Sequence, residues 1–158
     1  MWRLTFVTVS ALVLAGCDHA RIYEANHDFK DNRWALSDTS VFEFSIDDTT
    51  AVYNVILNIR NSIDFKTARL FLNYTLMDST TVPLRNRLVE QNLFDKKSGE
   101  PFGKSGLGNI YEHHLLLEPN ITFQAQGKYQ VKLTQMMRTD TLQEILSVGI
   151  RVEQAGIK

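Results

Sequence analysis

The amino-acid sequence predicts an all-β protein, an antiparallel β-sandwich of about seven or eight strands. Apolar and polar residues alternate with a period of two in several segments, which is typical of strands with one buried face. Short polar segments rich in Asp, Ser and Thr separate these stretches, as turns between antiparallel strands do. No segment keeps a helical period over three or more turns, which favours a sandwich over a helical architecture.

The alternating segments each predict a strand with an apolar inner face. In chain order, with the residues of the predicted inner face in parentheses, they are 41–46 (Phe42, Phe44, Ile46), 53–60 (Tyr53, Val55, Leu57, Ile59), 70–76 (Leu70, Leu72, Tyr74, Leu76), 110–118 (Tyr111, His113, Leu115, Leu117), 127–133 (Tyr129, Val131, Leu133) and 148–152 (Val148, Ile150, Val152). This pattern places a core between two sheets.

Three further segments refine the prediction. Residues 84–94 predict an edge strand, because Arg85, Arg87 and Glu90 would discourage pairing with another chain. Residues 142–146 are compatible with one helical turn. Tyr129 follows a turn glycine and precedes alternating aliphatic residues, which is similar to the tyrosine corner of immunoglobulin-like sandwiches. An immunoglobulin-like or jelly-roll-like sandwich is therefore expected.

The first residues have the pattern of a lipoprotein signal peptide. A positive charge at Arg3 precedes an apolar run of about 11 residues and the small residues before Cys17. The run is too short for a membrane span, which needs about 20 residues. Leu14-Ala15-Gly16-Cys17 resembles a lipobox, so cleavage is expected between Gly16 and Cys17, with lipidation of Cys17. The alternative is a plain signal peptide in which the cysteine is incidental.

This leader sets the expected organisation of the chain. The expected units are a signal peptide at 1–16, a lipidated tether at 17–33 and the sandwich domain at 34–158. Removal of the leader takes away one charge and leaves 142 residues with 16 basic and 18 acidic side chains. Such a balance argues against a polyanionic partner such as nucleic acid. One domain of this size can bury a core without disulfides.

One long loop is the candidate contact surface. Residues 95–109 (DKKSGEPFGKSGLGN) hold four of the eight glycines. Three residues separate Gly99 from Gly103, whereas a P-loop has four, so nucleotide binding is not expected. Long ordered loops often contact partners. The candidate contact residues of this loop are Phe102, Gly103, Lys104, Gly106 and Gly108.

Catalytic and metal chemistry find little support in the sequence. His113 and His114 are adjacent on a predicted strand and point to opposite faces, so they cannot readily bind one ion together. The serines of the polar loops lack the surroundings of an activated nucleophile. The sequence therefore predicts no enzyme, no cofactor and no metal site.

Three turns share a short motif that starts with Asp. The segments are Asp48-Thr49-Thr50, Asp78-Ser79-Thr80 and Asp140-Thr141-Leu142. They resemble the O-glycosylation motif of exported Bacteroidetes proteins, which makes Thr49, Ser79 and Thr141 candidate acceptors. Ordinary turn chemistry explains the same residues equally well.

Several stretches together resemble one known family. Besides the lipobox, they are 53–62 (YNVILNIRNS), 92–95 (NLFD), 101–108 (PFGKSGLG), 137–142 (MRTDTL) and 147–153 (SVGIRVE). They are similar to the gliding-motility lipoprotein family GldH of Bacteroidetes. The resemblance implies an outer-membrane lipoprotein of the gliding apparatus, which is linked to type IX secretion, without known catalytic residues or cofactor.

The first functional hypothesis is therefore a non-enzymatic, membrane-anchored lipoprotein of the gliding or type IX secretion-associated envelope machinery. It would be held by lipid to the outer membrane, on the periplasmic side, and contact other envelope lipoproteins or outer-membrane proteins. The alternative is a carbohydrate- or peptidoglycan-binding envelope lipoprotein. In that case an exposed aromatic residue, Phe71 or Trp34, would form the sugar-binding platform.

Overall fold

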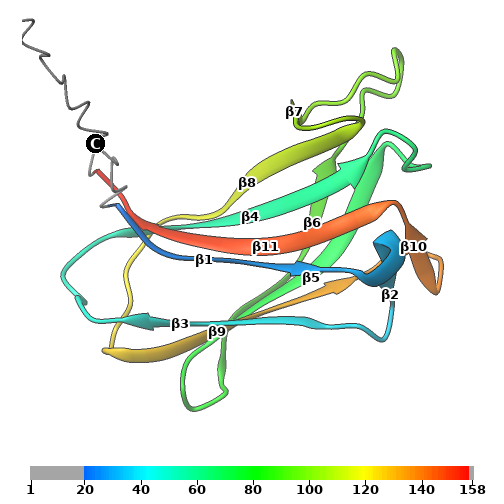
Figure 1. The fold of residues 1–158 in the computed structure, drawn as a ribbon. Helices are drawn as coiled ribbons and strands as arrows, with labels where there is room; N and C mark the ends of the chain where they lie inside the picture. The colour runs from blue at the N-terminus through cyan, green and yellow to red at the C-terminus, as the bar shows by residue number, and fades with distance from the viewer. Residues whose placement is uncertain (1–19, 157–158) are drawn as a thin grey trace, which may run out of the picture.

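The structure, a computed structural model, describes residues 20–156, so Gly16 and Cys17 lie outside the described residues. Strands make up the described chain, together with one 3-10 helix, η1 (Lys30–Asn32), and the connections. Two antiparallel sheets face each other across the core (Figure 1). The prediction of an antiparallel β-sandwich is confirmed.

The two main sheets contain five and four strands, and a small two-stranded sheet lies at one end. The five-stranded sheet has the order β1 (Arg21–Asp28), β11 (Ile145–Gln154), β4 (Tyr53–Ser62), β8 (Ile110–Ile121), β7 (Lys104–Ser105). The four-stranded sheet has the order β3 (Ser40–Ile46), β9 (Gly127–Gln135), β5 (Arg69–Met77), β6 (Pro83–Asn92). The small sheet pairs β10 (Thr141–Gln143) with β2 (Arg33–Ala35).

The predicted strands form where the alternation indicated. Strand β3 alternates strictly between buried and exposed residues, with Phe42, Phe44 and Ile46 inside. Strand β6 is an edge of the four-stranded sheet, as its charges predicted. These charges find partners on neighbouring strands, since Glu90 pairs with Arg69.

The segment expected to be a tether differs from the prediction. Residues 21–28 form β1, which pairs with β11 along its length, so the domain begins at residue 21 and not at 34. The inward side chains of β1 include Tyr23, whose ring lies 5.8 Å from that of Phe44. The strand escaped prediction because its inner face is weakly apolar and its outer face carries charge.

Residues 20–156 form eleven strands, where seven or eight were expected. The additional ones are β1 and three very short strands, β2, β7 and β10. The helical turn expected at 142–146 is wrong, because β10 ends at Gln143 and β11 begins at Ile145. Glu144 lies between them with φ 66°, and this left-handed residue turns the chain from one sheet to the other.

Aromatic side chains close the core near both ends. Trp34 is fully buried, stacks on Phe29 with ring centroids 5.0 Å apart, and donates its indole N–H to the carbonyl of Asp38 at 2.8 Å. Toward the other end, the Tyr129 hydroxyl donates to the carbonyl of Ala125 at 2.8 Å. This is the hydrogen bond of a tyrosine corner, which the sequence pattern predicted.

The sandwich has two ends with different connections. At the N-terminal end, Gln154 N–H donates to Ala20 and Ala155 N–H to Val52, so both described chain ends lie beside the connection 47–52. The connections 78–82 and 122–126 lie at the same end. We call the opposite end, formed by 36–39, 63–68, 93–109 and 136–140, the distal end (Figure 1).

Candidate functional site

The predicted contact loop, residues 95–109, lies at the distal end on a hydrogen-bonded frame. Phe94 and Pro101 form an isolated antiparallel bridge, and Phe102 N–H donates to the carbonyl of Leu93 at 2.9 Å. Leu93 and Phe94 in turn donate to the carbonyl of Ala68. The loop is therefore attached to the neighbouring connection 63–68 through its backbone.

Asp95 shapes the tip of this loop. Its carboxylate accepts the backbone N–H of Lys97 at 2.7 Å and of Ser98 at 2.8 Å. Hydrogen bonds from the backbone of Ser98 and Lys97 lower the pKa of Asp95. The side chain is thus engaged within its own turn.

Gly103 lets the loop approach β8 closely. A Cβ atom at this position would lie 2.7 Å from Nε2 of His113 and 2.8 Å from the carbonyl oxygen of Glu112. His113 is 4% exposed, and burial, followed by the charge of His114, lowers its pKa to about 4. A neutral imidazole therefore packs beneath the loop.

The remaining predicted contact residues divide into structural and exposed ones. Lys104 lies opposite Glu112 in the β7–β8 ladder, and Gly106 N–H donates to the carbonyl of Ile110 at 2.9 Å. Gly108 has φ 67°, which favours glycine. Phe102 is 60% exposed, and Leu107, which the sequence reasoning missed, is 92% exposed. The position of Leu107 between two glycines is the sequence feature that indicates its exposure.

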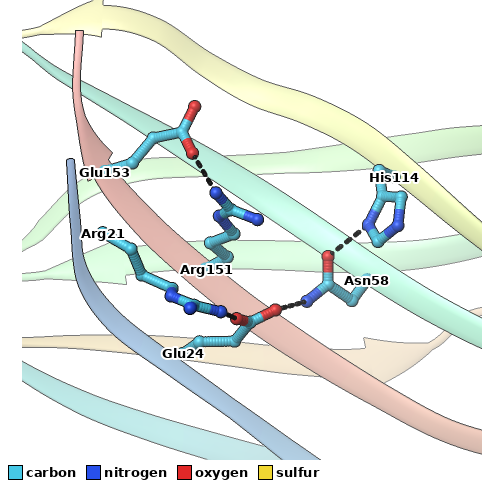
Figure 2. A network of polar contacts seen from close by, with 6 residues as sticks. All are labelled: Arg21, Glu24, Asn58, His114, Arg151 and Glu153. Atoms are coloured by element: carbon cyan, nitrogen blue, oxygen red, sulfur yellow. Dashed lines mark hydrogen bonds and ion pairs between the residues drawn. The ribbon is translucent and has the colours of Figure 1, made fainter. Parts of the chain in front are cut away.

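A polar network covers part of the outer face of the five-stranded sheet (Figure 2). Asn58 is 6% exposed, donates to Glu24 at 3.1 Å and pairs through Oδ1 with Nδ1 of His114 at 2.8 Å. Glu24 also pairs with Arg21. On the adjacent strand, Arg151 pairs with Glu153 at 2.9 Å. The network links β1, β4 and β8 across the sheet.

A hollow of about 190 Å³ lies beside this network. Polar side chains from three strands line it, among them Asn26, Asn58 and Glu112. A Cβ atom at Gly149 would lie 1.9 Å from Oδ1 of Asn26, so the Asn26 side chain lies over the sheet at that point. Glu112 pairs with Arg60, not with His114. Across residues 20–156, no three His, Cys, Asp or Glu side chains are grouped to hold a metal ion.

The candidate acceptor residues occupy different environments. Ser79 is exposed in the turn between β5 and β6, and Thr49 is half-buried. In both turns the Asp, at 48 or 78, accepts the N–H and the hydroxyl of the Thr two residues later, at 2.8 and 2.6 Å. Thr141 is half-buried in β10. These hydrogen bonds explain why Asp48 and Asp78 occur in the turns, whether or not Thr49 or Ser79 is glycosylated.

The described part of the chain contains no helix long and apolar enough to cross a membrane. The fold and its polar outer face define an antiparallel β-sandwich protein. Residues 21–152 match the family described as GldH lipoprotein, and the chain belongs to this family. It is accordingly a membrane-anchored lipoprotein of the cell envelope, in a family related to gliding motility.

Two relatives extend over almost the whole chain. A gliding motility lipoprotein GldH homolog of Christiangramia forsetii is 30% identical, covering 95% of this chain and 94% of the relative. The gliding motility lipoprotein GldH of Flavobacterium johnsoniae is 23% identical, covering 92% of each chain.

Solved structures are more distant. The infectious bursal disease virus VP2 subviral particle matches with a TM-score of 0.43 and 13% identity, and the match covers 94% of this chain but 36% of the viral chain. Dimeric latent PorU from Porphyromonas gingivalis matches with a TM-score of 0.37 and 7% identity, over 94% of this chain and 14% of PorU. These TM-scores carry no functional argument.

Proposed function

We propose that the chain is a non-enzymatic component of the gliding or type IX secretion-associated envelope machinery and acts through protein–protein contacts. Lipid on Cys17 would hold the sandwich to the outer membrane, on the periplasmic side. Because several acyl chains give stable attachment, the lipid can hold the domain while the distal end remains free to bind. The partners would be other envelope lipoproteins or outer-membrane proteins.

The exposure of Phe102 on a fixed backbone carries this proposal. Its N–H donates to the carbonyl of Leu93, yet Phe102 is 60% exposed at the end opposite Ala20 and Ala155. An aromatic side chain presented by an ordered backbone loses little conformational entropy on binding, and such residues often dominate interfaces. Leu107 adds a second exposed apolar side chain in the same loop.

Cross-linking in membranes, followed by mass spectrometry, tests the proposal. Phe102→Ala should reduce the recovery of envelope partners by about tenfold, as truncation of a central interface aromatic does. Val82→Ala is the matched control, because Val82 is 57% exposed but lies at the N-terminal end. Both variants should keep the thermal stability of the parent protein.

Three results would contradict this function. Cross-links unchanged by Phe102→Ala would remove the loop from the interface. Recovery of no envelope lipoprotein and no outer-membrane protein from the parent would count against a contact role altogether. Turnover of a substrate that one carboxylate or serine substitution abolishes would contradict the non-enzymatic assignment.

Glycan or peptidoglycan binding is the second candidate function, and the polar hollow beside Asn58 favours it. Amide and carboxylate side chains such as Asn26 and Glu112 are suited to sugar hydroxyls. Of the two aromatic residues expected from the sequence to form the sugar-binding platform, Trp34 is fully buried and therefore cannot do so. Phe71 is half-buried and remains a candidate. Pull-down on purified peptidoglycan with the parent and Asn26→Ala separates this function from the first.

Modification of the turn residues is a separate proposal. The exposed Ser79 is the most accessible of the three candidate acceptors, ahead of Thr49 and Thr141. Intact-mass measurement of the native protein should show added hexose if any of them is glycosylated. A mass equal to that of the acylated chain alone would end this proposal.

A further inference from the structure

An apolar groove of about 350 Å³ lies at the distal end, between the connection 63–68 and the segment 137–143. Phe65, at 7% exposed, and Leu142, at 4%, belong to its buried lining, and the half-buried Met137 lies beside them. The two lining segments are about 70 positions apart in sequence, so the groove exists only in the folded chain. We call it the Phe65 groove.

Hydrogen bonds hold the groove in shape. The sulfur of Met137 accepts the backbone N–H of Phe71 at 3.3 Å, and Met137 N–H donates to the side chain of Gln135 at 2.8 Å. Gln135 donates in turn to the carbonyl of Thr139 at 3.0 Å. Leu142 lies opposite the buried Trp34 in the β10–β2 ladder. Since the walls are already fixed, a ligand would not have to order them.

The charged side chains that line the groove are both basic, whereas the exposed Asp64 and Asp140 of the same two segments do not line it. Lys66 and Arg138 are the charged side chains that line it, and neither forms an ion pair with a side chain in residues 20–156. A second hollow of about 280 Å³ on the other side of Phe65 adds Lys96. The carboxylate there, Asp95, is engaged by backbone N–H groups. The apolar floor is thus lined by two cations, Lys66 and Arg138, that form no ion pair within residues 20–156.

We propose that the Phe65 groove binds a segment of a partner protein that presents an apolar side chain flanked by carboxylates. The apolar side chain would pack on Phe65 and Met137, and the carboxylates would meet Lys66 and Arg138. This inference rests on the proposed contact function and specifies the chemistry of the partner. A protein segment is favoured over an anionic lipid because the groove lies at the end of the sandwich opposite Ala20, the first described residue.

Methyl NMR with defined peptides tests the charge requirement. The mature chain with Cys17→Ser is labelled at its methionine methyl groups, and the Met137 resonance reports on the groove. Met77, buried in β5 at 6% exposed, is the internal reference. The probes are three short peptides with one central Phe, flanked by Asp, by Asn or by Lys. The Asp peptide should shift Met137 and leave Met77 in place.

Charge reversal sharpens the test. Lys66→Glu with Arg138→Glu should weaken binding of the Asp peptide by at least about tenfold and create binding of the Lys peptide. The control pair, Lys30→Glu with Lys132→Glu, changes the net charge equally without touching the groove, and its peptide preference should match that of the parent. Thermal melts confirm that both pairs fold.

Several outcomes would overturn the inference. Equal shifts by the Asp and Lys peptides, no shift of Met137, or the same loss in both variant pairs would each remove the charged groove as a binding site. A larger Met137 shift with phosphatidylglycerol vesicles than with the Asp peptide would assign the groove to lipid. If peptides fail while Phe102→Ala still abolishes partner cross-links, the inference fails and the proposed contact function stands.

Discussion

The imidazole of His113 lies directly beneath Gly103, so that a Cβ atom on the glycine would come within 2.7 Å of its Nε2 atom. Gly103→Ala should therefore destabilise the protein by about 1–3 kcal/mol, because an added methyl group must displace either the loop or the ring. Urea denaturation monitored by tryptophan fluorescence measures the change in unfolding free energy.

Gly106→Ala provides the matched control in the same loop. The nearest atom to a Cβ at Gly106 is 3.5 Å away, an ordinary contact, and neither glycine has a positive φ. Its effect should stay within about 0.5 kcal/mol, as for most surface substitutions. Equal destabilisation by both alanines would mean that the loop needs glycine for its backbone conformation and not because of the contact between Gly103 and His113.

Burial of His113 also predicts a pH dependence of stability. Its pKa is lowered from 6.5 to about 4 in the folded chain, so the unfolded chain binds the proton first as the pH falls. The stabilisation from the neutral ring is complete above pH 6.5 and is lost as the pH falls from 6.5 to about 4. Between about pH 7.5 and pH 5 the loss should be about 2 kcal/mol.

His113→Gln separates this effect from other titrations. Asp48, Asp78 and Asp95 all have lowered pKa values, so their contributions are lost below this window. Urea midpoints of parent and variant at both pH values give the comparison. An unchanged difference between the two pH values in His113→Gln would show that another group titrates.

The strands that could be predicted from sequence are those whose inner face is strongly apolar. Phe42, Phe44 and Ile46 are sufficient to identify β3, because the period of two and burial coincide there. Strand β1 could not be recognised in this way, since pairing with β11 and not its own apolarity holds it in the sheet. The turn at Glu144 is hidden in the sequence, because the spacing of Leu142 and Leu146 is also compatible with a helical turn.

The candidate site was predictable only in its local part. Phe102, between a proline and a glycine, could be expected on a loop surface, and it is exposed. The packing of Gly103 on His113 joins two elements that no spacing rule connects. The Phe65 groove needs two segments about 70 positions apart, and so emerges only when the sheets are assembled.

Removal of the lipid attachment site should release the protein from the membrane. Cys17→Ser should leave the sandwich intact, because Cys17 precedes its first strand, β1, which begins at Arg21. We expect the variant in the soluble fraction with the melting temperature of the parent, and without function in cells. Fractionation, palmitate labelling and a motility or secretion assay measure this. Full function of the soluble variant would show that the lipid only localises the protein and is not needed for its activity.

Tyr129→Phe tests the tyrosine corner. The hydroxyl donates to Ala125 at 2.8 Å and ties the connection 122–126 to the start of β9. Its removal leaves a carbonyl without this donor and should cost about 1 kcal/mol of unfolding free energy. Equilibrium urea denaturation at pH 7.5 is a suitable measurement, because the linkage to His113 is weak there.

Tyr74→Phe is the matched comparison, since the same atom is removed from another buried tyrosine of the same four-stranded sheet. Tyr74 is fully buried, but its hydroxyl has no hydrogen-bond partner in the described chain. Burial, followed by the charge of Glu118, raises the pKa of Tyr74, so its hydroxyl is neutral. The variant should be as stable as the parent or slightly more so, because an unsatisfied polar group is removed. A loss as large as that of Tyr129→Phe would mean that bound water satisfies the Tyr74 hydroxyl.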